Sequence, residues 1–234
     1  NALDLEMVLA LEAACYRLET VPGLRAAILT GAGDKAFCAG GDIAAWSGYS
    51  AQEFGQVWVR HGHRMFDALA RLRVPLIAVL NGHALGGGLE LAATADLRIA
   101  EPHIKLGQPE TGLGIIPGWS GTQRTVRRFG SQLVRRMALA GEVFTAEDAL
   151  RLGLVDAVVG KGDGLALARE WAARIAARGP LATQVTKQLI NAAEGEETER
   201  TLEAIAGSVA AASADLKEGV AAFKEKRKPV FKGE

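Results

Sequence analysis

The residues best suited to chemistry lie around one glycine-rich stretch, Asn81 to Asp96. Three consecutive glycines, Gly86 to Gly88, stand between an apolar run and helix-forming residues, and Glu90 follows two positions later. Glycine lets the backbone approach a ligand closely, and the first N–H groups of a helix have no partner within the helix. The stretch therefore predicts backbone donors suited to negative charge. Glu90 is then either a partner of the helix dipole or a catalytic group.

A second small-residue turn and a second carboxylate bear on that choice. Ala39 and Gly40 occupy an expected strand-to-helix turn, and two such turns could each offer an N–H to a polarised carbonyl oxygen. Glu110 follows Pro109 in an irregular, apolar segment, where no helix is expected whose N-terminus would favour a carboxylate. Two carboxylates near glycine turns indicate general acid and general base chemistry. Close helix–strand packing is the alternative explanation for the glycines.

Other familiar motifs are excluded. The contiguous glycines do not fit the dinucleotide fingerprint G-x-G-x-x-G, and the phosphate loop is absent. Gly118 to Thr122 resembles a nucleophile elbow, but Thr122 replaces its last glycine and no strand precedes it, which argues against a serine hydrolase. His61 and His63 are two apart on an expected helix and so face different sides, which argues against a metal site.

Composition excludes several classes of partner. The chain has 234 residues, with 27 Lys and Arg against 27 Asp and Glu, so its charge does not favour nucleic acid or membrane binding. No apolar run approaches the ~20 residues that span a bilayer. Cys15 and Cys38 have neither metal-site nor disulfide spacing, which indicates a reducing compartment, and we expect the cytoplasm. The chain starts at Asn1 instead of Met, so we expect a fragment whose start is missing. A removed targeting segment is the other possibility.

Hydrophobic periodicity predicts an α/β core over residues 1–160 and a helical region over 161–234. We expect strands at 26–30, 76–80, 97–100, 104–106 and 155–159. We expect helices at 1–19 with Asn1 as N-cap, at 51–72, 122–129 and 132–140, and at 145–152 with Thr145 as N-cap. Beyond 165 the chain is predicted to be helical, with breaks at Gly179-Pro180, near Gly195 and near Ser213.

Three motifs together, F-C-A-G-G-D-I, N-G-H-A-L-G-G-G-L-E-L-A-x-x-x-D and L-G-Q-P-E-x-G-L-G-I-I-P-G, resemble the enoyl-CoA hydratase/isomerase (crotonase) superfamily. The resemblance covers essentially the whole chain. It implies a spiral of ββα units followed by helices used in trimer assembly, with trimers often pairing into hexamers. It also implies an acyl-CoA thioester substrate and no cofactor, because coenzyme A is part of the substrate.

The resemblance also implies roles for residues at the matching positions. Oxyanion-hole N–H groups would come from Ala39 and Gly87, and Glu90 and Glu110 would be the catalytic glutamates. Gly118 matches a glycine whose backbone helps to position the second glutamate. Further candidates for substrate binding are Ala36, Asp42, Ile43, Trp46, Trp119 and, near CoA phosphates, Lys226.

Because both glutamates are present, the resemblance favours an enoyl-CoA hydratase that adds water across the 2,3 double bond of a 2-enoyl-CoA, as in fatty-acid β-oxidation. Glu90 would activate the water and Glu110 would deliver the proton to C2, although their joint involvement is the stronger expectation. The alternatives are an enoyl-CoA isomerase or another crotonase reaction, and a non-catalytic CoA-ester-binding protein. Trp119 and Ser120 stand where the family more often has two small residues. Trp119 could narrow the acyl pocket or point into the core, so acyl length stays open.

Overall fold

The computed structural model describes all 234 residues, which form two compact units, Asn1–Lys187 and Gln188–Glu234. The first unit contains a parallel four-stranded sheet in the order β10-β7-β5-β2. Its central strand β5 is wholly apolar, as is typical of a parallel strand that is covered on both faces. All the strands of this sheet were predicted from sequence to within two residues at either end: β2 (Ala27–Thr30), β5 (Leu76–Leu80), β7 (Leu97–Ala100) and β10 (Ala157–Val158).

A second four-stranded sheet has the order β3-β6-β8-β9, in which only the pair β8–β9 is antiparallel. Its strands are β3 (Ala36–Cys38), β6 (His83–Leu85), β8 (Lys105–Gly107) and β9 (Val143–Thr145). A two-stranded parallel sheet joins β1 (Ala2–Leu3) to β4 (Gly40–Gly41). The chain enters the two larger sheets alternately, from β2 to β3, from β5 to β6 and from β7 to β8, which gives the expected spiral of ββα units.

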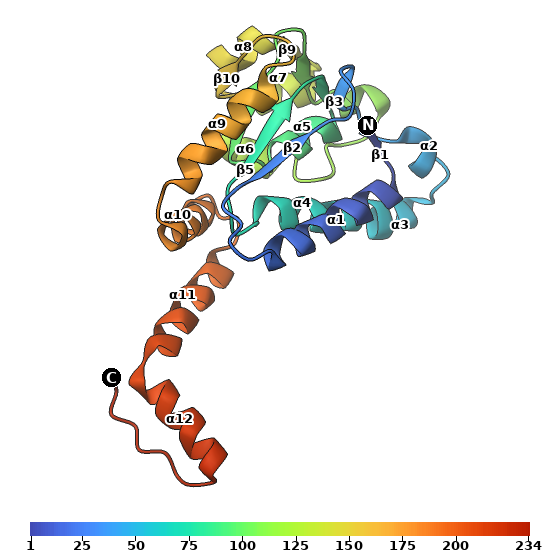
Figure 1. Ribbon diagram of the computed structural model, residues 1–234. Helices are drawn as coiled ribbons and strands as arrows, with labels where there is room; N and C mark the ends of the chain where they lie inside the picture. The colour runs from blue at the N-terminus through green and yellow to red at the C-terminus, as the bar shows by residue number, and fades with distance from the viewer. The chain divides into compact units, whose positions relative to one another are not determined.

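Helices surround this spiral. α1 (Leu5–Thr20) and α4 (Arg60–Ala70) lie side by side (Figure 1), and α9 (Gly164–Ala176) packs on β5 and β7. The compact unit therefore continues past residue 160, where the sequence analysis ended the α/β core, to Lys187. The helices are α1 (Leu5–Thr20), α2 (Ile43–Trp46), α3 (Ala51–Glu53), the π-helix η1 (Phe54–Val59), α4 (Arg60–Ala70), α5 (Gly87–Ala92), the 3-10 helix η2 (Glu110–Leu113), α6 (Arg124–Phe129), α7 (Ser131–Ala140), α8 (Ala146–Arg151), α9 (Gly164–Ala176) and α10 (Pro180–Ala193).

The ends of two helices test the capping predictions. Thr145 caps α8 as predicted, since its hydroxyl accepts from the N–H of Asp148 at 3.2 Å. The prediction for Asn1 is wrong, because Asp4 is the N-cap of α1. The amide of Asn1 instead donates to the carbonyl oxygens of Ala32 at 2.8 Å and Ala36 at 2.6 Å.

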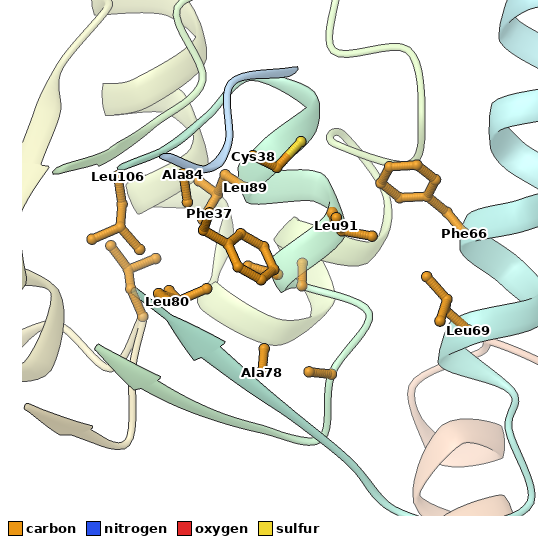
Figure 2. Packing of buried hydrophobic residues seen from close by; sticks show 14 of the residues in the cluster. Phe37, Cys38, Phe66, Leu69, Ala78, Leu80, Ala84, Leu89, Leu91 and Leu106 are labelled. Carbon is orange, nitrogen blue, oxygen red and sulfur yellow. The ribbon is translucent and has the colours of Figure 1, made fainter. Parts of the chain in front are cut away.

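The core of the first unit lies between the sheets and α5. Figure 2 shows part of it, in which Phe37 of β3, Leu80 of β5 and Leu89 of α5 are gathered. All five residues of β5 are buried, and so is every residue of α5, including Glu90. A six-residue helix is marginal by itself, so burial of all its faces must hold α5 in place. The carboxylate of Glu90 is thereby placed inside the protein.

The second unit contains α11 (Thr198–Ala212) and α12 (Ala214–Glu225), with the break at Ser213 that the sequence predicted. Ser213 caps α12 by accepting from the N–H of Leu216 at 3.1 Å. Both helices expose large apolar side chains, among them Leu202, Val209 and Phe223. No helix of the structure is long and apolar enough to cross a membrane.

Candidate active site

The triple glycine opens α5 and fits its surroundings closely. Gly86 has φ 55° and ψ −125°, a conformation that disfavours other residues. A Cβ on Gly88 would lie 1.9 Å from the carbonyl oxygen of Cys38, so close packing explains this glycine. Gly87 is the first helical residue, and its N–H therefore has no acceptor within α5. Since Gly87 also lines a cleft, its N–H is suited to binding a ligand oxygen.

The turn around β4 lines the same cleft through Ala39, Gly40 and Gly41. The N–H of Ala39 donates to the carbonyl oxygen of Asn1 at 3.2 Å, which argues against Ala39 as an oxyanion donor. The N–H of Asp42 donates to Leu3 of β1 at 2.7 Å. β4 pairs with β1 alone, so the turn has no further strand partner. The turn is a second candidate source, beside Gly87, of an N–H for a ligand oxygen.

Glu90 is almost fully buried, with 3% of its surface exposed. Its Oε1 accepts from the backbone N–H groups of Trp119 and Gly121, each at 2.7 Å. Burial and the charge of Glu110 raise the pKa of Glu90 to about 8, against the opposing effect of these two hydrogen bonds and of Arg124. The glycine at 121 is required, because a Cβ there would lie 2.5 Å from Oε1 of Glu90.

Glu110 starts the 3-10 helix η2 and has 7% of its surface exposed. Neither of its carboxylate oxygens has a hydrogen-bond partner in the protein. Burial raises the pKa of Glu110 to about 7. A Cβ on Gly86 would lie 3.2 Å from Oε1 of Glu110, so the absence of a side chain there leaves the carboxylate next to the start of α5.

The two glutamates line one cleft, together with both glycine turns, and its volume is about 220 Å³. Burial raises the pKa of both carboxyl groups, and the charge of Glu110 raises that of Glu90 further, so the two hold one proton between them over a range of pH. The lower pKa belongs to Glu110, whereas the resemblance gave Glu110 the proton. The hydrogen bonds on Glu90 favour its ionised form, so we assign the shared proton to the pair and not to one residue.

The structure brings most of the predicted site residues together. Ala39, Gly87, Glu90, Glu110, Gly118, Ile43, Trp46 and Trp119 all line the cleft. Ala36 lies on β3 and Asp42 caps α2 through the N–H of Ala44 at 3.0 Å, and neither lines the cleft. No hydrogen bond joins Gly118 to Glu110. Lys226 is exposed at the C-cap of α12 in the other unit.

The cleft also has an apolar wall that was not predicted from the sequence, formed in part by Phe54, Trp58, Val59, Leu113, Ile115 and Ile116. Phe54 and Trp58 lie within the helix predicted at 51–72, where spacing alone does not distinguish a cleft-lining apolar side chain from a core one. Trp119 combines the two roles proposed for it. It is 3% exposed, packs against Trp58 and Phe66 with ring centroids 4.9 and 5.2 Å away, and lines the cleft.

Comparison with known proteins decides the family. The family model described as enoyl-CoA hydratase/isomerase matches residues 1–234. The chain belongs to the enoyl-CoA hydratase/isomerase family. It is 40% identical to the crotonyl-CoA hydratase of Syntrophomonas wolfei over 238 aligned positions, covering 99% of this chain and 89% of that protein. It is 37% identical to the short-chain-enoyl-CoA hydratase of Clostridium acetobutylicum, covering 97% of this chain and 88% of that protein.

Solved structures of the family share this fold. The crystal structure of an enoyl-CoA hydratase from Bacillus anthracis superposes with a TM-score of 0.78 at 34% identity, covering 100% of this chain and 91% of that chain. The resemblance drawn from the three motifs is thereby confirmed for the family and for the fold.

Proposed function

We propose that this chain is an enoyl-CoA hydratase, which adds water across the 2,3 double bond of a 2-enoyl-CoA thioester. The observation that carries the proposal is the pair of buried glutamates, Glu90 and Glu110, in one cleft beside the N–H of Gly87. The relatives named crotonyl-CoA hydratase and short-chain-enoyl-CoA hydratase support it.

The backbone would stabilise the charge that develops during the addition. As water oxygen bonds to C3, the π electrons of the double bond move to the thioester oxygen and form an enolate. The N–H of Gly87 is free to meet that oxygen, and we propose that the turn of Ala39, Gly40 and Gly41, which lines the same cleft, supplies the second donor. Loss of one such donor typically lowers the rate by about 10²–10³-fold.

The glutamate pair would handle the protons. One carboxylate takes a proton from the attacking water, and the pair returns a proton to C2 of the enolate, so the enzyme ends in its starting state. The form with one shared proton is therefore the active form. Addition of water requires no cofactor beyond the coenzyme A that the substrate itself carries.

The test measures the absorbance of the conjugated thioester while purified protein acts on a 2-enoyl-CoA and, separately, on the corresponding 3-enoyl-CoA. Hydration removes the absorbance of the conjugated thioester, whereas isomerisation of the 3-enoyl compound creates it. We expect the absorbance to fall rapidly with the 2-enoyl substrate and to rise much more slowly with the 3-enoyl substrate. The reverse preference would indicate an isomerase, and binding without turnover of either would indicate a non-catalytic CoA-ester-binding protein.

We also propose that residues 188–234 support a homotrimer, which could pair into a hexamer. The apolar side chains exposed on α11 and α12 support this, since Phe223 is 85%, Val209 69% and Leu202 65% exposed. Light scattering after size-exclusion chromatography should give three or six times the chain mass of 24.6 kDa. A monomer at micromolar concentration would contradict the proposal.

A further inference from the structure

The side chain of Trp119 occupies the inner wall of the cleft, directly beside the reacting groups. A Cβ on Gly87 would lie 3.2 Å from Cε3 and Cζ3 of Trp119, so the six-membered ring covers the residue whose N–H faces the ligand. A Cβ on Gly41 would lie 3.5 Å from Cη2 of the same ring. The indole therefore contacts both turns that would hold the thioester oxygen.

A glycine on another helix makes room for this indole. A Cβ on Gly62 of α4 would lie 2.0 Å from Nε1 of Trp119 and 2.2 Å from Cε2, which is impossible without displacing the ring. Gly62 is in the interior of a helix, where glycine costs about 1 kcal/mol relative to alanine. Its small size is explained by the large side chain that it faces.

The indole is also fixed in orientation. Its Nε1 donates to the carbonyl oxygen of Trp58 at 3.3 Å, and its ring packs between those of Trp58 and Phe66. The backbone N–H of the same residue holds Oε1 of Glu90 at 2.7 Å. Since Trp119 is anchored at both its backbone and its ring, an acyl chain cannot push it aside without disturbing the glutamate.

From this packing we infer that Trp119, seated against Gly62, limits the length of the acyl chain, so that the enzyme acts on short 2-enoyl-CoA substrates. The inference rests on the proposed hydratase function. A thioester oxygen at the N–H of Gly87 places C2 and C3 next to the glutamates, and carbons beyond C3 then meet the rings of Trp119 and Trp58. Each methylene that a pocket accepts or rejects changes the specificity by about 10–200-fold.

The experiment measures kcat/KM for crotonyl-CoA, 2-hexenoyl-CoA, 2-octenoyl-CoA and 2-decenoyl-CoA. We expect the wild type to prefer crotonyl-CoA. In Trp119→Ala, the ratio of kcat/KM for 2-decenoyl-CoA to kcat/KM for crotonyl-CoA should rise by at least about tenfold. Trp119→Phe keeps an aromatic ring in the core and should shift the limit by a smaller step. If Trp119→Ala does not fold, the length profile of Trp119→Phe tests the inference instead.

Two controls separate acyl selection from general damage. Trp171→Ala removes an indole of α9 that packs against a different core cluster, and it should leave the length profile unchanged. Gly62→Ala should lower the thermal midpoint in the wild type, but much less in the Trp119→Ala background, where the clashing ring is gone.

The possible failures are distinguishable. A wild type that hydrates no 2-enoyl-CoA of any length contradicts the hydratase function itself. A wild type that hydrates 2-decenoyl-CoA as well as crotonyl-CoA overturns the inference and leaves the function intact. The inference is likewise overturned if both Trp119 variants retain the wild-type length profile.

Discussion

The hydroxyl Oγ of Ser120 lies 3.0 Å from Nδ1 of His63, and this contact ties the loop that holds Glu90 to helix α4. Ser120 lies between Trp119 and Gly121, the two residues whose N–H groups bind the carboxylate. Its φ of 75° is in the left-handed region, which costs a residue with a side chain roughly 1–2 kcal/mol. The contact with His63 offsets part of that cost.

We expect His63→Ala to lower the free energy of unfolding by about 1–3 kcal/mol, because it leaves the buried hydroxyl of Ser120 without this partner. In a Ser120→Gly background, where neither hydroxyl nor left-handed strain remains, the same change should cost about 1 kcal/mol less. Urea denaturation of the four proteins measures the difference. Equal costs in the two backgrounds would show that the contact contributes nothing.

The raised pKa of Glu90 makes stability depend on pH. Its pKa in the folded protein is about 8 against an ordinary 4.5, so the folded state binds more protons than the unfolded state between these values. Stability from this group is therefore present below its ordinary pKa and is lost as pH rises through about 8. Glu90→Gln should abolish this loss of stability at high pH.

At neutral pH we expect Glu90→Gln to be more stable than the wild type by roughly 1–3 kcal/mol, and the difference should shrink toward pH 5. Thermal unfolding across this pH range provides the measurement. A variant that is less stable than the wild type by the same amount at every pH would show that burial does not destabilise the ionised form of Glu90.

A buried ion pair anchors α10 to the α/β core. Nζ of Lys187 lies 2.8 Å from Oδ2 of Asp96 and donates to the carbonyl oxygen of Val74 at 3.0 Å. The same carboxylate oxygen accepts from the N–H of Leu76 at 2.7 Å. Asp96→Ala removes a carboxylate that pairs with a lysine whose side chain is only 6% exposed, so we expect the free energy of unfolding to fall by about 3–5 kcal/mol.

Asp34→Ala is the matched control for that change. It breaks an ion pair with Lys161 at 2.9 Å, in which the two side chains are 58% and 64% exposed. An exposed pair contributes little to stability, because water solvates both charges whether or not they are paired. Urea unfolding that gives the two variants the same stability would contradict the structural role assigned to Asp96.

Gly88 should be intolerant of any side chain. Its Cβ would lie 1.9 Å from the backbone carbonyl oxygen of Cys38, which is not able to move as a flexible side chain could. We expect Gly88→Ala to cost at least about 1–3 kcal/mol and to displace the start of α5. Gly207→Ala, in α11 with open space around it, should instead stabilise by up to about 1 kcal/mol. Comparable losses in thermal stability for both variants would show that the lack of space at Gly88 does not determine its effect.

Patterns local in sequence predicted the fold well. The apolar run Leu76–Leu80 is a fully buried strand, and the hydroxyl of Thr145 caps a helix, because neither property depends on distant residues. Short strands such as His83–Leu85 and Val143–Thr145 were missed, since pairing with distant strands creates them. Asn1 fails as a cap for the same reason, because carbonyl groups more than 30 residues away bind its amide.

The site was predictable to a similar degree. Motif positions identified Glu90, Glu110 and Gly87, and all three line the cleft. The bond between Ala39 and Asn1 depends on the pairing of β1 with β4, which no motif encodes. The relation of Trp119 to Gly62, and that of Ser120 to His63, join residues 57 positions apart, so neither follows from local spacing.

Whether Glu90 and Glu110 act together in catalysis is tested by the rate of crotonyl-CoA hydration by Glu90→Gln, Glu110→Gln and the double variant. Each glutamine is nearly the same size as glutamate but cannot act as a general acid or a general base. We expect each single variant to lose about 10²–10⁴-fold in kcat with its fold retained by circular dichroism, and the double variant to lose little more, because the pair acts as a unit. Folded single variants that both hydrate crotonyl-CoA at the wild-type rate would contradict the account.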